Sequence, residues 1–302
     1  MSTIFVLGGG GFLAGYIARH YRSQGWRVVL IGRGAAVEAG DSDARHVWQL
    51  PHQEFAHLLA VERPQLCVNA TGRASVPASV LEPLADFEAS TTVNFRILDD
   101  LRRRSPETIY IHLSSAAVYG NPVRLPVHED AEIAPISPYG WHKRLSEIVI
   151  EEHATLFGMR AASLRIFSAY GEGLHRQVIW DLISKMRAAA SGPVEILGLP
   201  EDTRDFIHAA DVAAALAAVV EHGALKGECY NAAYGRQVSI RELAELIAAR
   251  CAQRAAVRFT NVRSPGHPGR WHADISKLRA LGFAPGISLE RGIDGILQGL
   301  AR

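Results

Sequence analysis

The sequence predicts an α/β fold in which a doubly wound parallel sheet is joined to a smaller C-terminal lobe. Apolar, β-branched segments alternate with longer helical segments through the first two-thirds of the chain. The first apolar segment, 3–7, leads directly into four consecutive glycines. After about residue 170 the elements become shorter and less regular, and proline and glycine become frequent. Because strands that alternate with helices pair in parallel and are covered on both faces, a doubly wound sheet is the simplest topology.

The expected elements follow from these patterns in chain order. Strands are predicted over 3–7, 27–31, 66–70, 108–113 and 161–166. Helices are predicted over 12–24, 53–61, 84–104, 138–157, 175–190, 209–221 and 239–252. We expect residues 1–170 to form the main domain, with 203–230 returning to it. Residues 171–302 should form mainly a second lobe above the strand ends, where open α/β sheets bind ligands.

Composition excludes several classes of function. The 302 residues are 48% hydrophobic and 21% charged, with a formal net charge of +1. Such a balance favours neither a nucleic-acid partner nor an acidic membrane surface. Three scattered cysteines predict no disulfide framework, and no cysteine or histidine spacing predicts a metal site. Since no signal peptide or long apolar segment is evident, we expect a cytoplasmic protein without a membrane span.

The glycines after the first strand have the spacing of a dinucleotide-binding loop. Gly8, Gly11 and Ala14 follow the pattern Gly-x-x-Gly-x-x-Ala. Gly8 permits a tight turn, Gly11 lets a pyrophosphate approach the backbone, and Ala14 lets the helix pack close to the sheet. The helix that begins near Phe12 and Leu13 would point its free amides at the phosphates. This context indicates a Rossmann-type domain that binds NAD(P).

The residue expected to determine the preference for NAD(H) or NADP(H) is not acidic. Cofactors with a free ribose hydroxyl are usually held by Asp or Glu at the end of the second strand. Here the second strand ends at Gly32 and Arg33, and the next acid is Glu38. Because a guanidinium can pair with a 2′-phosphate, Arg33 favours NADP(H), with NAD(H) as the alternative.

A tyrosine and a lysine have the spacing of a catalytic pair. Tyr139 and Lys143 are four residues apart, so on a helix they lie on one face. A nearby ammonium should lower the pKa of the phenol toward neutral pH and make it a usable acid or base. The serines Ser114 and Ser115 end an earlier apolar segment and could orient a reacting oxygen.

Together these motifs resemble the extended short-chain dehydrogenase/reductase family, in its nucleotide-sugar epimerase/dehydratase branch. The resemblance covers nearly the whole chain. Its landmarks are the glycine loop at 8–14, Ser-Ser-Ala-Ala-Val-Tyr-Gly at 114–120, Tyr139 with Lys143, Leu-Arg-Ile-Phe-Ser-Ala-Tyr-Gly at 164–171 and Arg-Asp-Phe-Ile-His at 204–208. The combination is specific for the branch but not for one substrate.

The resemblance implies roles for individual residues. Ser115 would hold the substrate oxygen, Tyr139 would exchange a proton with it, and Lys143 would bind the nicotinamide ribose and tune Tyr139. Asn94 matches a helix asparagine that supports the site and the cofactor.

Two arginines match residues that bind the substrate in this branch. Arg204 matches the arginine that clamps the diphosphate of the sugar nucleotide, and Arg263 resembles a second clamp. Either could instead be a solvated surface arginine.

Two alanines after the serines narrow the reaction. By the resemblance, members that eliminate water from the sugar carry an acidic pair where this chain has Ala116 and Ala117. Elimination needs both a base and an acid, and methyl groups supply neither. Two reactions that need only hydride transfer and one proton on oxygen remain. We favour NADPH-dependent reduction of a keto-sugar nucleotide, of the 4-keto-6-deoxy type; the alternative is an NAD-dependent 4-epimerase.

A non-catalytic protein that senses NAD(P) is a third possibility, because a fold does not dictate a function. It is disfavoured because Ser115, Tyr139 and Lys143 are all retained. The helices 84–104 and 138–157 carry apolar residues on more than one face. They could pack entirely within the core, or form a homodimer interface.

Overall fold

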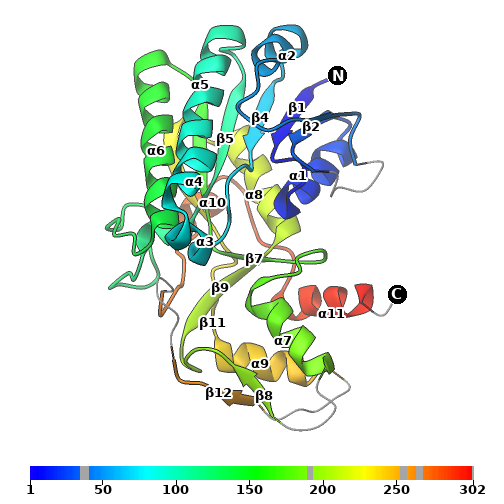
Figure 1. The fold of residues 1–302 in the computed structure, drawn as a ribbon, viewed down its shortest axis with the longest axis vertical. Coiled ribbons are helices and arrows are strands. Elements are labelled where there is room, and N and C mark those ends of the chain that lie inside the picture. Colours follow the sequence, from blue (N-terminus) through cyan, green and yellow to red (C-terminus); the bar gives the residue numbers. More distant parts are fainter. Residues whose placement is uncertain (35–40, 189–192, 252–256, 263–267, 301–302) are drawn as a thin grey trace.

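A seven-stranded parallel sheet forms the centre of the larger lobe (Figure 1). The computed structural model describes residues 1–34, 41–188, 193–251, 257–262 and 268–300. The strand order is β10-β6-β5-β4-β1-β2-β3, and every neighbouring pair is parallel. The order reverses beside β1, as in a doubly wound sheet, so the predicted fold class is confirmed.

The large sheet consists of β1 (Thr3–Leu7), β2 (Arg27–Gly32), β3 (Ala44–Val47), β4 (Leu66–Asn69), β5 (Ile109–Ser115), β6 (Ala161–Ile166) and β10 (Lys226–Ala232). The helices around it are α1 (Phe12–Ser23), α2 (Phe55–Glu62), α3 (Val76–Leu81), α4 (Pro83–Phe87), α5 (Val93–Arg104), α6 (Pro138–Phe157), α8 (Ala209–His222) and α10 (Ser276–Arg279). A 3-10 turn, η2 (Ala116–Tyr119), follows β5 directly.

Apolar side chains on both faces of the sheet form the core. On one face, Ile4, Val6 and Leu113 pack with residues of α1 and α8 in one buried cluster. On the other face, Phe5 and Tyr110 pack with residues of α2, α5 and α6. Since successive residues of a strand point to opposite faces, strands covered on both sides must be apolar almost throughout.

The smaller lobe is built on two short sheets. Its elements are β7 (Ser168–Tyr170), α7 (Gln177–Ala188), β8 (Val194–Ile196), β9 (Thr203–His208), β11 (Gln237–Ser239), α9 (Ile240–Ala248), β12 (Val257–Phe259) and α11 (Leu289–Gly299). One sheet has the order β11-β9-β7, and the other pairs β12 with β8. Helices α7, α9 and α11 supply most of a separate apolar cluster.

The structure contains elements that were not expected. In the smaller lobe these are β7, β8, β9, β11, β12 and α11, and beside the large sheet they include α3 and α10. Strands β3 and β10 were not predicted as strands, although both extend the large sheet. Strand β5 continues through Ser115, so both serines belong to the strand. The helix expected over 84–104 consists of α4, a π-helical turn η1 (Glu88–Thr92) and α5. The domain boundary at residue 170 stays a prediction.

In the part of the chain that the structure describes, no helix combines the length and apolarity needed to cross a bilayer.

Candidate active site

The glycine loop leaves the carboxyl end of β1 in a conformation that needs glycine. Gly8 has φ of +79°, and a Cβ atom on it would lie 2.6 Å from the carbonyl oxygen of Ala70. The amides of Gly8 and Gly9 both donate to the carbonyl of Ile31 on β2. Gly11 precedes α1, whose first turn has neither a side-chain cap nor an acidic residue. The first amides of α1 therefore face outward with the positive end of the helix dipole, as pyrophosphate binding requires.

Ser115 ends β5 at the same edge of the sheet. Its hydroxyl accepts a hydrogen bond from the amide of Ala117, 3.2 Å away, and so caps the following 3-10 turn. Ala116 is fully buried, and Ala117 is partly buried. The side chains that follow Ser115 therefore bring no acid or base into the site.

Helix α6 places Tyr139 and Lys143 beside Ser115. Ser137 caps the helix by accepting from the amide of Gly140, and Pro138 occupies the first turn. A Cβ atom on Gly140 would lie 2.6 Å from the carbonyl oxygen of Ala117, so glycine allows the helix to approach η2. The Tyr139 phenol is half-buried and hydrogen-bonds with Ser115.

Lys143 is buried behind the tyrosine. Its Nζ donates to the carbonyl oxygen of Leu113 at 2.7 Å and lies 5.9 Å from the centre of the Tyr139 ring. Ser115, Tyr139 and Lys143, which the sequence singled out, thus meet at the carboxyl end of β5. Their catalytic roles stay predictions.

The pKa of the phenol departs from the expected direction. Burial raises the pKa of Tyr139 above its usual value; the hydrogen bond with Ser115 lowers it, the charge of Asp86 raises it and the charge of Arg176 lowers it. Burial also lowers the pKa of Lys143 to about 8, against the raising effects of Asp86 and Glu147. The net direction is opposite to the expected lowering, because burial outweighs the hydrogen bond with Ser115 and the charge of Arg176. That Lys143 tunes the phenol stays a prediction.

Asn94 supports the site from within the core. It is completely buried, its Oδ1 accepts from the Tyr110 hydroxyl at 2.5 Å, and its Nδ2 donates to the carbonyl of Ser146 at 3.2 Å. Asn69 donates to the same Oδ1, 3.3 Å away. These bonds engage both ends of the amide and tie α5 to β4, β5 and α6. The predicted support of the cofactor by Asn94 stays a prediction.

The structure describes two of the three predicted arginines, Arg33 and Arg204. Arg33 is exposed directly after β2, beside the glycine loop, and forms no ion pair with a described carboxylate. Arg204 on β9 donates to the carbonyl of Thr203 at 2.7 Å, and its guanidinium lies 5.6 Å from the Trp271 ring centre. Arg263 lies outside the described residues.

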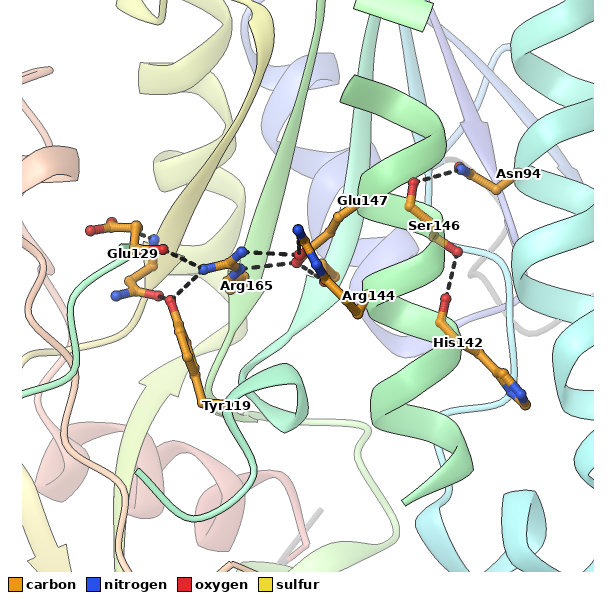
Figure 2. Close-up of polar contacts among 10 residues, drawn as sticks. Asn94, Tyr119, Glu129, His142, Arg144, Ser146, Glu147 and Arg165 are labelled. Carbon is orange, nitrogen blue, oxygen red and sulfur yellow. Dashed lines mark hydrogen bonds and ion pairs between the residues drawn. The ribbon is translucent and has the colours of Figure 1, made fainter. Parts of the chain in front are cut away.

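A buried ion pair fixes α6 to β6, and a serine of β5 bonds to the same carboxylate. Both oxygens of Glu147 accept from Arg165 at 3.0 Å, and Ser114 donates to Glu147 at 2.6 Å. Arg165 also donates to the Tyr119 hydroxyl and to the carbonyl of Glu129, each at 2.8 Å (Figure 2). Glu147 is 1% and Arg165 3% exposed, so the pair holds β5, β6, η2 and α6 together without solvent screening.

Sequence reasoning missed these supporting residues. Glu147 stands within a predicted helix, where nothing in the sequence distinguishes a buried charge from an exposed one. Arg165, by contrast, lies inside an apolar strand, and a charge there is the one signal that could have indicated a buried partner.

Comparison with known proteins agrees with this geometry. Residues 4–233 match the family model described as the NAD dependent epimerase/dehydratase family. The chain belongs to this family.

Relatives of known description share its length and fold. A putative UDP-glucose 4-epimerase of Methanocaldococcus jannaschii is 28% identical over 98% of this chain and 97% of its own. A GDP-6-deoxy-D-mannose reductase of Pseudomonas aeruginosa is 25% identical over 78% of this chain and 80% of its own. The UDP-glucose 4-epimerase of Thermotoga maritima, solved with UDP-glucose, superposes with a TM-score of 0.89 at 22% identity, covering 99% of this chain and 100% of that one. The resemblance inferred from the motifs is therefore confirmed.

The buried ion pair generates a stability prediction. Arg165→Met should lower the free energy of unfolding by about 3–5 kcal/mol, because it leaves the Glu147 carboxylate buried without its main partner. Lys185→Met, which breaks the exposed pair with Asp181, should cost about 1 kcal/mol or less. Urea unfolding measures both. Equal losses in the two variants would contradict the role given to the buried pair.

Proposed function

We propose that this protein is an NAD-dependent 4-epimerase of a nucleotide sugar. One observation carries the proposal: Ser115, Tyr139 and Lys143 converge at the end of β5, and the side chains next to Ser115 are the methyl groups of Ala116 and Ala117. This set can move a proton on and off one oxygen. It offers no second acid–base pair beside the serine for eliminating water.

The chain fits the dinucleotide that the family description implies. The cradle at Gly8 has no room for a Cβ atom, and the uncapped first turn of α1 suits a pyrophosphate. Gly8, Gly11, Phe12 and Leu13 would hold the phosphates, and Lys143 would hold the nicotinamide ribose. NAD, when bound, would accept hydride in its oxidised form and donate it in its reduced form.

The residues of the chain would act in a fixed order. Ser115 holds the hydroxyl on carbon 4 of the sugar, and the Tyr139 phenolate removes its proton while the carbon is oxidised. The sugar then turns over in the site, and Tyr139 returns the proton to the oxygen as the carbon is reduced on its other face. Because Tyr139 acts as base and then as acid at one oxygen, no further catalytic group is needed. Lys143, as an ammonium, would stabilise the phenolate that this cycle requires.

Reduction of a keto-sugar nucleotide, which the sequence favoured, would use the same residues. The reductase of Pseudomonas aeruginosa and the position of Arg33 keep it as a second candidate. The epimerase is preferred because the Methanocaldococcus relative of that description matches nearly the full length of this chain. By the same relation we propose UDP-glucose and UDP-galactose as the first substrates to try. Arg204 would bind the diphosphate of the nucleotide.

A homodimer through α5 and α6 is part of this proposal. The ring of Phe95 on α5 contacts that of His153 on α6, and Arg102 lies over the ring of Phe157, 4.7 Å from its centre. Phe95 and Phe157 are nevertheless 43% and 49% exposed, and Leu156 is 68% exposed. These neighbouring apolar groups on two adjacent helices suit an interface between copies of the chain.

Substitution of the phenol tests the reaction. Tyr139→Phe should reduce the interconversion of UDP-glucose and UDP-galactose by about 10²–10⁴-fold, because the proton on the reacting oxygen loses its carrier. NAD binding, followed by calorimetry, should persist. Tyr21→Phe is the matched control, since the Tyr21 hydroxyl is buried without a partner in the described structure. Full activity in Tyr139→Phe would contradict the proposal, and a signalling response that survives it would support the NAD(P) sensor.

Cofactor identity separates the two candidate reactions. Nucleotide extracted from freshly purified protein should be NAD, and the emptied protein should bind NAD more tightly than NADP. Arg33→Ala should leave NAD affinity within about twofold, because NAD has no 2′-phosphate for the guanidinium to bind. Arg124→Ala, which removes another exposed arginine, is the control. A preference for NADP that disappears in Arg33→Ala would favour the reductase instead.

A further inference from the structure

A buried acid lies beside α6, the helix that carries Tyr139 and Lys143. It is not among the site residues predicted from the sequence. Asp86 on α4 is 1% exposed, and its Oδ2 lies 2.6 Å from Nδ1 of His142 on α6. Its Oδ1 is buried and has no hydrogen-bond partner in the described structure. A buried carboxylate oxygen without a partner is costly, so a charge nearby is needed to compensate for it.

The segment that carries Asp86 is fixed against the first turns of α6. The amide of Tyr139 donates to the hydroxyl of Ser79 on α3 at 3.1 Å. The hydroxyl of Thr91 on η1 donates to the carbonyl of His142 at 3.1 Å. Asp86 lies between these two anchors in sequence and contacts His142, the residue directly before Lys143. Its carboxylate is therefore held at the part of α6 that carries both predicted catalytic side chains.

The ammonium of Lys143 lacks a close counter-charge. Lys143 is 6% exposed and its Nζ donates to the carbonyl of Leu113. Among the described residues, no carboxylate lies within ion-pair distance of it. Glu147 is near, but its two oxygens already accept from Arg165, Ser114 and Arg144. Figure 2 shows Glu147 and His142 on opposite sides of α6. Of the two buried acids, Asp86 is thus the one whose charge is not already balanced by an arginine.

We infer that Asp86 supplies the buried counter-charge for the ammonium of Lys143. It is a positioning residue that acts through Lys143 and does not touch the reacting atoms. The inference rests on the proposed function in one respect, because that function is what gives Lys143 a catalytic role. The charge relation itself concerns the protein alone.

The groups around Lys143 agree with this assignment. They are His112 on β5, Tyr139, His142 and Glu147 on α6, and Asp86 on α4. Burial and the charge of Lys143 both hold the pKa of His112 well below its usual value, so His112 stays neutral and adds no positive charge. Burial lowers the pKa of Lys143 to about 8, and Asp86 and Glu147 oppose that fall.

Lysine-specific NMR tests the inference directly, because the chain has only four lysines: Lys143, Lys185, Lys226 and Lys277. The ε-amino groups are labelled and titrated with pH in the full-length protein, as purified and after removal of any bound nucleotide. Lys143→Arg assigns the signal of Lys143. In the emptied wild-type protein it should titrate near pH 8, and in Asp86→Asn about one pH unit lower. The other three lysines should not move.

Three matched variants separate charge from packing. Asp86→Glu and His142→Asn both keep the carboxylate, so each should leave the titration of Lys143 at or above its wild-type position. Asp99→Asn removes an acid from α5 that pairs with surface arginines, and it should leave Lys143 unchanged. If Asp86→Asn does not fold, Asp86→Glu and His142→Asn still test whether retaining the charge is sufficient.

The outcomes are distinct. A shift in Asp86→Asn alone supports the inference. No shift in Asp86→Asn, or equal downward shifts in Asp86→Asn and His142→Asn, would overturn it, because the pair would then only support packing. The titration of Lys143 could shift in Asp86→Asn while neither the wild type nor any variant interconverts nucleotide sugars. In that case the charge relation stands and the proposed function fails.

Discussion

The close approach of α6 to the end of β5 is the constraint on which the site depends. Gly140 permits that approach, since any side chain there would meet the carbonyl of Ala117. The Glu147–Arg165 pair then holds α6 against the strands, with Ser114 bonded to the same carboxylate. The position of the Tyr139 phenol beside Ser115 is a consequence of these contacts. A site that exchanges one proton with one oxygen needs such rigid placement.

Burial gives the site its electrostatic character. The same packing that aligns Tyr139 and Lys143 shields both from water, which raises the pKa of the phenol and lowers that of the ammonium. Both shifts oppose the charged forms that catalysis requires. Compensating charges are therefore part of the active site even where they do not touch a substrate. Glu147 is committed to Arg165, and Asp86 carries the remaining negative charge on the other side of α6.

Much of the fold could be predicted because its signals are local. The strand leading into the Gly8 loop, and α6 with its Ser137-Pro138 start, are set by turn chemistry and periodicity that one segment carries alone. Strands β3 and β10 escaped prediction because they are short or polar and gain their structure from pairing at the sheet edges. The pairing of Asp86 with His142, and of Glu147 with Arg165, joins residues from separate elements. Only the packed fold decides whether such charges meet, so sequence patterns predicted the candidate reacting groups but not the residues around them.

The central claim is that the site moves a proton only on and off oxygen, with no proton chemistry at carbon. The direct test is to run the reaction in D₂O and examine the recovered nucleotide sugars by mass spectrometry and NMR. Oxidation and reduction at carbon 4 should leave every carbon-bound hydrogen unexchanged, because the hydrogen on that carbon moves as hydride. Deuterium on a sugar carbon would contradict the account, since it would require a base at carbon that the methyl groups of Ala116 and Ala117 cannot supply.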